Sequence, residues 1–97
     1  MKHIPLNKLN TSQYHIVYFS MVGSRSTGSC LVGASTKKEA KKLVQAQYGN
    51  ARVLLCHIFP LDEGNAIDAG YDVNDDDEVV IDDVPDKGKV VEICFGT

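Results

Sequence analysis

The feature that most constrains the fold is a nine-residue run, from Tyr14 to Val22, that is rich in aromatic and β-branched residues. Such residues favour a β-strand, in which successive side chains point to opposite faces of the sheet. The two faces carry, respectively, Tyr14, Ile16 and Tyr18, and His15, Val17, Phe19 and Met21. Because both faces are largely apolar, we expect this strand to lie in the middle of a sheet.

The residues that follow predict a hairpin and then a helix. Residues 23–28 are a turn cluster, and residues 30–34 are expected to form the second strand of the hairpin. Thr36 and Glu39 have the spacing of a capping box, with Thr36 as the N-cap. Apolar residues then recur at helical spacing until residues 49–50, so we expect a helix of about three turns lying across the sheet.

The rest of the chain predicts more strands. Residues 52–59 are expected to form a third strand. Residues 62–77 are expected to form an acidic loop, with a short strand near residues 71–73. Two further segments, residues 78–82 and 89–95, are rich in apolar side chains and flank a turn-forming segment. This pattern predicts a second hairpin.

This order of elements, β-β-α-β-β-β, predicts an α+β fold in which an antiparallel sheet of about five strands packs on one helix. The chain has 97 residues, a length that suits one domain with one hydrophobic core. We expect residues 1–97 to form that domain, with residues 1–13 as an N-terminal arm or edge.

Membrane and secreted proteins are disfavoured by what the sequence lacks. It has no window of 18 apolar residues for crossing a membrane, and residues 1–8 lack the apolar run of a secretory signal. Cys30, Cys56 and Cys94 are an odd number in strand-like contexts, unlike the dense, paired cysteines of a small secreted domain. We therefore expect a cytoplasmic protein with reduced, mostly buried thiols and no membrane association.

Charges are segregated along the chain, although the net charge is only −3. Residues 1–61 carry eight Lys and Arg against the single acid Glu39, which gives +7. Residues 62–97 carry twelve acids against two Lys, which gives −10, and eleven of those acids lie within residues 62–86. We expect the folded protein to present two surfaces of opposite charge.

The basic half offers a candidate nucleic-acid-binding surface. Four of its lysines lie in the first turns of the predicted helix, beside backbone N–H donors and the positive end of the helix dipole. The candidate residues are Arg25, Lys37, Lys38, Lys41, Lys42 and Arg52. We favour the alternative, a solvated helix face balanced by the acidic half. No nucleic-acid motif accompanies the lysines, and residues 23–28 lack the G-K-[ST] ending of a phosphate loop.

The acidic half admits three interpretations. Asp72-x-Asn74-x-Asp76 places oxygen ligands at alternate positions, as a calcium loop does, but Asp77 stands where that loop needs Gly. Solvated acidic loops that keep a small domain soluble are the second interpretation. The third is a face that binds a basic protein with fast, salt-dependent association. The residues predicted to form this face are Asp72, Asp75, Asp76, Asp77, Glu78, Asp82 and Asp83.

Catalytic and metal-binding patterns are weak. Cys56 and His57 are adjacent, but consecutive strand residues face opposite ways and so cannot form a nucleophile–base pair. The cysteines have no C-x-x-C spacing, and His3, His15 and His57 have no metal-ligand spacing. We therefore expect no catalytic residues, no metal site and no cofactor.

These observations favour a non-catalytic binding module that engages and blocks a basic, nucleic-acid-handling protein through its acidic half. Small inhibitors that mimic nucleic acid, including phage anti-defence proteins of about this size, use such surfaces, and the analogy is one of charge alone. One alternative is a nucleic-acid-binding domain that uses the basic helix at residues 37–42. Another is a self-associating subunit, a homo-oligomer whose oppositely charged surfaces pair between copies.

Overall fold

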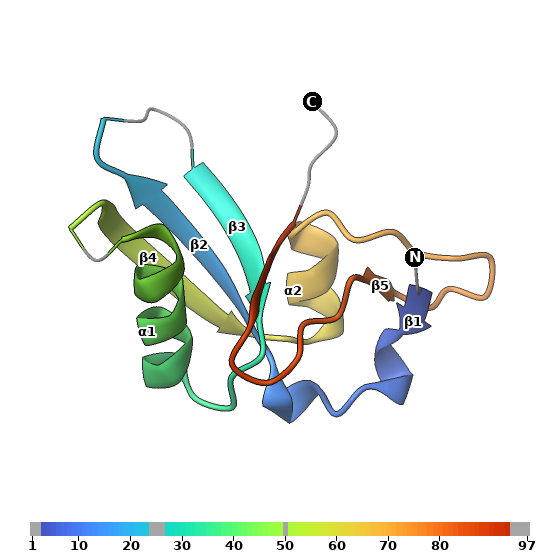
Figure 1. Ribbon diagram of the computed structural model, residues 1–97. Helices are drawn as coiled ribbons and strands as arrows, with labels where there is room; N and C mark the ends of the chain where they lie inside the picture. The colour runs from blue at the N-terminus through green and yellow to red at the C-terminus, as the bar shows by residue number, and fades with distance from the viewer. Residues whose placement is uncertain (1–2, 24–26, 50, 94–97) are drawn as a thin grey trace.

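The computed structural model describes residues 3–23, 27–49 and 51–93. The strands are β1 (His3–Pro5), β2 (His15–Met21), β3 (Thr27–Val32), β4 (Val53–Pro60), β5 (Val80–Asp82) and β6 (Val90–Glu92). The helices are α1 (Lys37–Tyr48) and α2 (Glu63–Asp68), with 3-10 turns at Leu6–Lys8 and Thr11–Gln13. An antiparallel sheet in the order β4-β2-β3-β6 packs on the main helix, α1, and β1 pairs with β5 in a separate two-stranded sheet (Figure 1). The predicted α+β class is confirmed.

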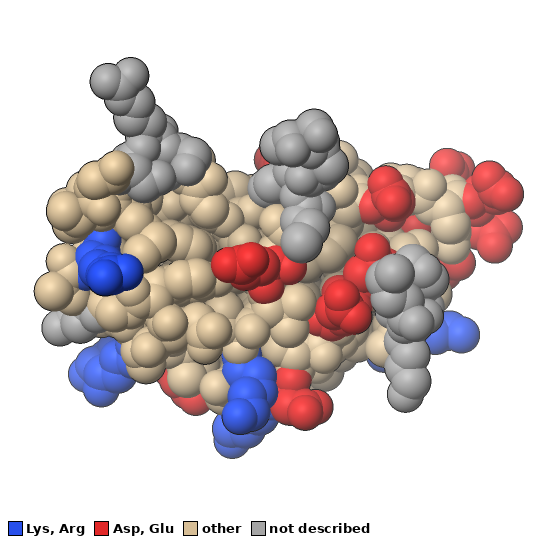
Figure 2. Space-filling model, turned by 45° about the horizontal axis from the view of Figure 1, so that its top comes forward, with Lys and Arg blue, Asp and Glu red and all other residues tan. Residues whose placement is uncertain are grey.

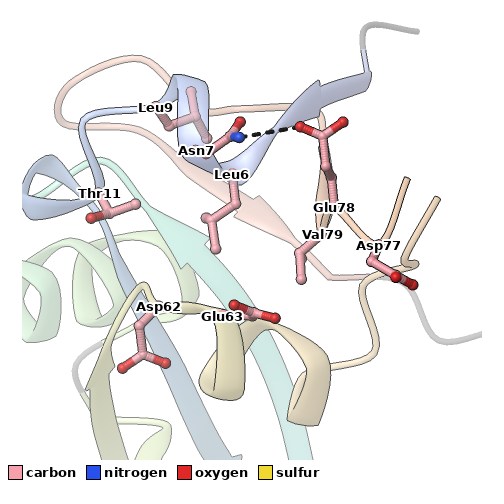
Figure 3. Close-up of a pocket in the computed structure, with 9 residues that line it drawn as sticks. All are labelled: Leu6, Asn7, Leu9, Thr11, Asp62, Glu63, Asp77, Glu78 and Val79. Carbon is pink, nitrogen blue, oxygen red and sulfur yellow. Dashed lines mark hydrogen bonds between the residues drawn. The ribbon is translucent and has the colours of Figure 1, made fainter. Parts of the chain in front are cut away.

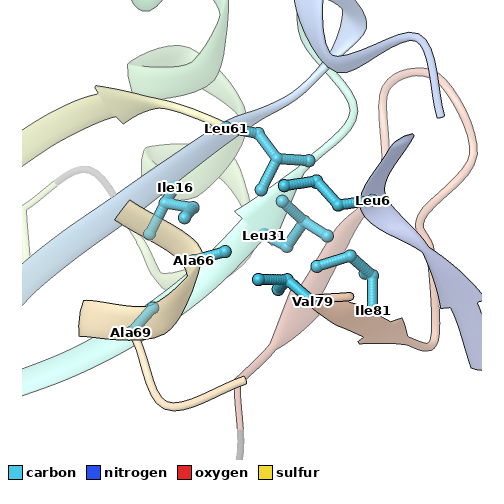
Figure 4. Packing of buried hydrophobic residues seen from close by; sticks show 8 residues of the cluster. All are labelled: Leu6, Ile16, Leu31, Leu61, Ala66, Ala69, Val79 and Ile81. Atoms are coloured by element: carbon cyan, nitrogen blue, oxygen red, sulfur yellow. The ribbon is translucent and has the colours of Figure 1, made fainter. Parts of the chain in front are cut away.

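The central position predicted for residues 14–22 is also confirmed, because β2 lies between β4 and β3. On one face of the sheet, Val17 and Phe19 pack with Ala40 and Val44 of α1. On the opposite face, a second cluster fills the space between the sheet, α2 and the β1–β5 pair (Figure 4). Its buried members are Leu6, Ile16, Leu31, Leu61, Ala66, Ala69, Val79 and Ile81. Both faces of β2 are therefore covered.

Helix α1 begins and ends where the sequence predicts. Thr36 is the N-cap, and its side-chain oxygen accepts a hydrogen bond of 3.1 Å from the backbone N–H of Glu39. Ala40 and Val44 are fully buried, and they form the apolar stripe that faces the sheet. The helix stops at Gly49, whose φ of 96° is accessible to glycine at little cost.

The predicted loop over residues 62–77 needs correction, because its first part forms α2. Asp62 caps this helix by accepting a hydrogen bond of 2.8 Å from the backbone N–H of Asn65. Ala66 and Ala69 are fully buried against the sheet, and Leu61 anchors the entry to the helix. Six helical residues among many acids give too short a periodic pattern to stand out from a loop.

The predicted second hairpin, between residues 78–82 and 89–95, is wrong. Strand β5 instead pairs with β1 (Ile4 opposite Ile81), and β6 pairs with β3 (Leu31 opposite Val91). Ile81 is thereby fully buried in the core, and Val90 packs partly buried against the cluster on the α1 side. The N-terminal segment is thus part of the fold. Residues 94–95 lie outside the described part of the chain, and near residues 71–73 only a single bridge forms, from Val73 to Val79.

Candidate acidic binding surface

The tip loop, residues 72–78, is the most acidic segment, and Asn74 organises it from within. Oδ1 of Asn74 accepts hydrogen bonds from the backbone N–H groups of Asp76 (3.0 Å) and Glu78 (2.9 Å). The backbone of Asn74 also bonds to that of Asp77 and of Glu78. Asp77 takes a φ of 61°, a left-handed conformation that Asp tolerates better than most residues. The loop is therefore a closed turn, held from within by Asn74.

Most of the predicted binding residues are exposed in or near this loop. Asp72, Asp75, Asp76 and Asp77 are exposed, whereas Glu78 is half-buried. In Figure 2, acidic side chains gather at one end of the visible face, and most basic ones lie towards the other end and the lower margin. Five of the seven predicted residues therefore lie in one short segment, and four of these five are exposed.

Asp82 and Asp83 stand apart from the tip loop. Asp82 is the last residue of β5 and is partly buried. Burial raises the pKa of the Tyr71 phenol above its ordinary value of 10.0, and the nearby carboxylate of Asp82 raises it further. Asp83 is exposed and lines a separate hollow of about 520 Å³ beside Tyr14 and Lys87. These two carboxylates thus belong to a neighbouring surface.

A cavity of about 460 Å³ opens at the base of the tip loop (Figure 3). Its lining combines carboxylates, two neutral polar groups and an apolar floor. The lining residues are Leu6, Asn7, Leu9, Thr11, Asp62, Glu63, Asp77, Glu78 and Val79. Buried Leu6 and Val79 form part of the floor and are linked by a 2.7 Å hydrogen bond from the Leu6 N–H to the Val79 carbonyl. Only two of these residues, Asp77 and Glu78, were predicted as binding residues.

The two other carboxylates of this cavity, Asp62 and Glu63, come from the start of α2. Sequence reasoning missed them as site residues because it predicted a loop there. Asn7, on the first 3-10 turn, donates a 3.2 Å hydrogen bond to Oε2 of Glu78 and so joins the N-terminal segment to the rim. The signal available in the sequence was the cap pattern of Asp62 and Asn65, followed by the small apolar residue Ala66.

The basic candidates lie elsewhere. Lys37, Lys38, Lys41 and Lys42 are exposed on the first turns of α1, and Arg52 is exposed before β4. Arg25 lies outside the described residues. Helix α1 and the tip loop stand at opposite ends of the molecule, whose longest dimension is 42 Å (Figure 1). The tip loop therefore does not cover the lysines.

Two of the side chains considered for catalysis or metal binding, His15 and Cys30, are buried within the fold. His15 is buried, and its Nδ1 donates a 2.7 Å hydrogen bond to the carbonyl oxygen of Ala34. Cys30 is fully buried with its Sγ 3.8 Å from the Val17 carbonyl oxygen. The Cys56 and Cys94 side chains lie outside what the structure describes. Within the described ranges, no group of three or more His, Cys, Asp or Glu side chains is placed to hold a metal ion.

The fold and this surface define an α+β protein with a carboxylate-rimmed cavity at one end and a lysine-bearing helix at the other. No protein-family model matches the chain, and no curated protein or solved structure matches it. Among the helices of the described residues, none has the length and apolar character needed to cross a membrane.

Proposed function

We propose that this protein is a non-catalytic binding module whose acidic end engages a basic, nucleic-acid-handling protein and blocks or regulates it. The observation that carries the proposal is the cavity whose rim holds Asp62, Glu63, Asp77 and Glu78, directly below the exposed carboxylates of the tip loop. Regularly spaced phosphates are what a nucleic-acid-binding groove recognises, and a dense set of carboxylates offers the same sign of charge.

The composition of the cavity suits the side chains that such a groove carries. Lys and Arg have an apolar stem and a cationic head. The floor at Leu6 and Val79 would contact the stem, while the carboxylates of Asp77 and Glu78 would contact the head. Leu6 and Val79 also belong to the hydrophobic core, so the binding role rests on the carboxylates that surround them.

The separation of charge also supports a directed encounter. The tip loop and α1 lie at opposite ends of the molecule, so the protein has an electric dipole along its length. A basic partner would be attracted to the acidic end and repelled by α1, which orients the encounter before contact. Association should accordingly be fast at low salt and weaken as salt rises.

The decisive experiment reverses the charges of the tip loop. Asp75, Asp76 and Asp77 are changed together to Lys, and retention of proteins from a native lysate is compared with that of the unchanged protein. Salt elution and competition by duplex DNA show whether the retained proteins bind nucleic acid. We expect the triple variant to lose the proteins that DNA displaces, while its circular dichroism spectrum stays the same.

A matched control reverses the same number of charges at the other end of the molecule. Lys37, Lys38 and Lys41 are exposed on α1, and changing them to Glu should leave the retained proteins unaltered. Equal retention by the tip-loop variant and the unchanged protein would refute the proposal. Equal loss in both variants would show that retention does not depend on the tip loop in particular, and it would also refute the proposal.

The second candidate function is nucleic-acid binding by α1, and the observation in its favour is that the four lysines are exposed and not covered by the tip loop. It predicts retention of RNA or DNA in a gel shift, with the logarithm of affinity falling linearly with the logarithm of salt concentration. Absence of any shift at low salt would eliminate this candidate.

A further inference from the structure

Strand β4 forms one edge of the four-stranded sheet, and its sequence lacks the charged residues that usually protect an edge. It is eight residues long and, among the described residues, has β2 as its single strand neighbour. Its sequence, VLLCHIFP, contains no Asp, Glu, Lys or Arg. Natural edge strands are commonly kept from pairing by charged residues, by short length or by prolines. In β4 such features are confined to the two ends of the strand, where the register shifts near Leu54 and where Pro60 ends it.

Hydrogen bonding within the sheet shows which way the backbone of β4 points. The carbonyl of Ser29 on β3 accepts a 3.0 Å bond from the N–H of Ile93, on the β6 side. Alternate residues of a strand turn their backbone groups to alternate neighbours, so Cys30 bonds towards Val17 of β2. The next residue of β2, Tyr18, therefore turns its backbone groups towards β4.

The same alternation continues into β4. His57 lies opposite Tyr18 and bonds to β2, so the backbone groups of Cys56 and Ile58 point away from the sheet. Pro60 shares this outward orientation, and at that position its missing N–H costs no hydrogen bond within the sheet. The outer edge of β4 thus presents outward-facing backbone donors and acceptors in the middle of the strand.

Two large apolar side chains on β4 are also exposed. Leu54 is 65% exposed, and the pairing of β2 with β4 shifts register around it. Phe59 is 39% exposed and contacts Tyr18 edge to face, with ring centroids 5.7 Å apart. A second strand along this edge would cover both Leu54 and Phe59 while using the outward backbone groups.

We propose that β4 pairs with β4 of a second copy of this chain in an antiparallel, two-fold symmetric dimer. The two-fold axis lies at the middle of the strand, at Cys56 or His57, and the sheet becomes continuous across both copies. Antiparallel pairing sets the beginning of each β4 against the end of the other. With the axis at Cys56, Arg52 faces Pro60 of the second copy, and with the axis at His57 it faces Asp62.

Charge complementarity selects a second copy as the occupant of this edge. Arg52 is exposed just before β4, and Asp62 and Glu63 are exposed just after it. The dimer therefore places a base of each copy beside two acids of the other, and symmetry makes this contact twice. Pairing in the parallel direction would set like charges together at both ends. The dimer shares Asp62 and Glu63 with the rim of the acidic cavity. It does not rest on the proposed function, because its readout is self-association and the tip loop takes no part in it.

Analytical ultracentrifugation of the full chain over a range of concentrations tests the dimer. We expect a monomer–dimer equilibrium whose dissociation constant rises at least about tenfold in Leu54→Lys, since Lys blocks strand addition at an edge. The matched control is Val73→Lys, which places the same charge on another exposed apolar residue, 46% exposed and away from β4, and should leave dimerisation unchanged.

Charge reversal tests the orientation of the two strands. Arg52→Glu should weaken the dimer, and adding Glu63→Lys to the same chain should restore it in part, because one of the two acids beside residue 52 is then replaced by a base. Amide hydrogen exchange gives a second readout. Exchange at Ile58 should slow as the protein concentration rises, whereas exchange at His57, whose N–H faces β2, should not change.

A protein that is monomeric at every concentration would overturn the proposal. So would a dimer that Leu54→Lys leaves intact, or one that Leu54→Lys and Val73→Lys weaken equally. Failure of the double charge variant to regain dimerisation would overturn the antiparallel arrangement.

Discussion

The side-chain amide of Asn7 donates a hydrogen bond of 3.2 Å to Oε2 of Glu78, across a sequence separation of 71 residues. This bond holds a carboxylate of the tip loop against the N-terminal segment at the rim of the acidic cavity (Figure 3). A neutral amide therefore helps to position an acidic group of the proposed binding surface.

Replacing Asn7 with Ala should weaken binding of the basic partner several-fold, because Glu78 would lose the group that orients it. The free energy of unfolding should change by no more than about 0.5 kcal/mol, since Asn7 is exposed. Partner titration followed by isothermal calorimetry measures the first effect, and urea denaturation measures the second. Unchanged affinity would show that this bond has no part in binding.

Asp62 should have two separable roles, as the N-cap of α2 and as a charge at the cavity rim. Asp62→Asn keeps a good capping side chain, so it should preserve stability and lower affinity for a basic partner. Asp62→Ala removes the cap as well and should cost about 1 kcal/mol of stability. Urea denaturation and partner titration of both variants distinguish the roles. Equal stability of the two variants would contradict the capping role.

Gly33 should tolerate no side chain, because a Cβ there would collide with the backbone carbonyl of Asp86. Its backbone also bonds to Lys89 and Gly88, so the segment before β6 cannot move away easily. We expect Gly33→Ala to destabilise the protein by about 2 kcal/mol in urea denaturation.

Gly64 provides the control for that substitution. It lies in α2, and a Cβ there would meet Oδ1 of Asp62 at an ordinary 3.8 Å. Gly64→Ala should therefore be neutral or stabilise the protein by about 0.5 kcal/mol through reduced freedom of the unfolded chain. Similar losses of stability in Gly33→Ala and Gly64→Ala would contradict the crowding argument.

Stability should fall at alkaline pH through Tyr48 and Tyr71. Burial raises the pKa of both phenols, and a 2.9 Å hydrogen bond from Tyr48 to Oε1 of Glu92 adds to the effect. Because each folded-state pKa lies above the unfolded value of 10.0, their contribution is complete below pH 10.0 and declines as the pH rises above it. Thermal unfolding across that range measures the decline, which Tyr48→Phe should reduce. A flat stability profile above pH 10.0 would contradict it.

The elements that could be predicted from the sequence are those with local signals. The two apolar faces of residues 14–22 placed β2 in the middle of the sheet, and the Thr36–Glu39 spacing located the start of α1. Strand pairing over long separations has no comparable signal. The sequence of residues 78–82 is equally compatible with pairing to residues 89–95 and with pairing to β1. Only the packing of Ile81 into the shared core selects the pairing with β1.

Only part of the acidic surface could likewise be predicted from the sequence. A run of carboxylates is visible in any sequence, so Asp77 and Glu78 could be predicted. The apolar floor at Leu6 was not, because its contribution depends on the N-terminal segment folding back on the tip loop. Asp62 and Glu63 joined the rim only because a short helix, α2, forms where a loop was predicted.

The pairing of β1 with β5 has a consequence for how the protein is made. During synthesis residues 3–5 emerge well before their partners at residues 80–82. Contacts of such high sequence separation form late and slowly. Leu6 directly follows β1 and Val79 directly precedes β5, so the cavity floor that they form depends on this pairing. A nascent chain would therefore display the lysines of α1 before it could assemble the acidic cavity, and the capacity to bind a basic partner would arise only after β1 and β5 have paired.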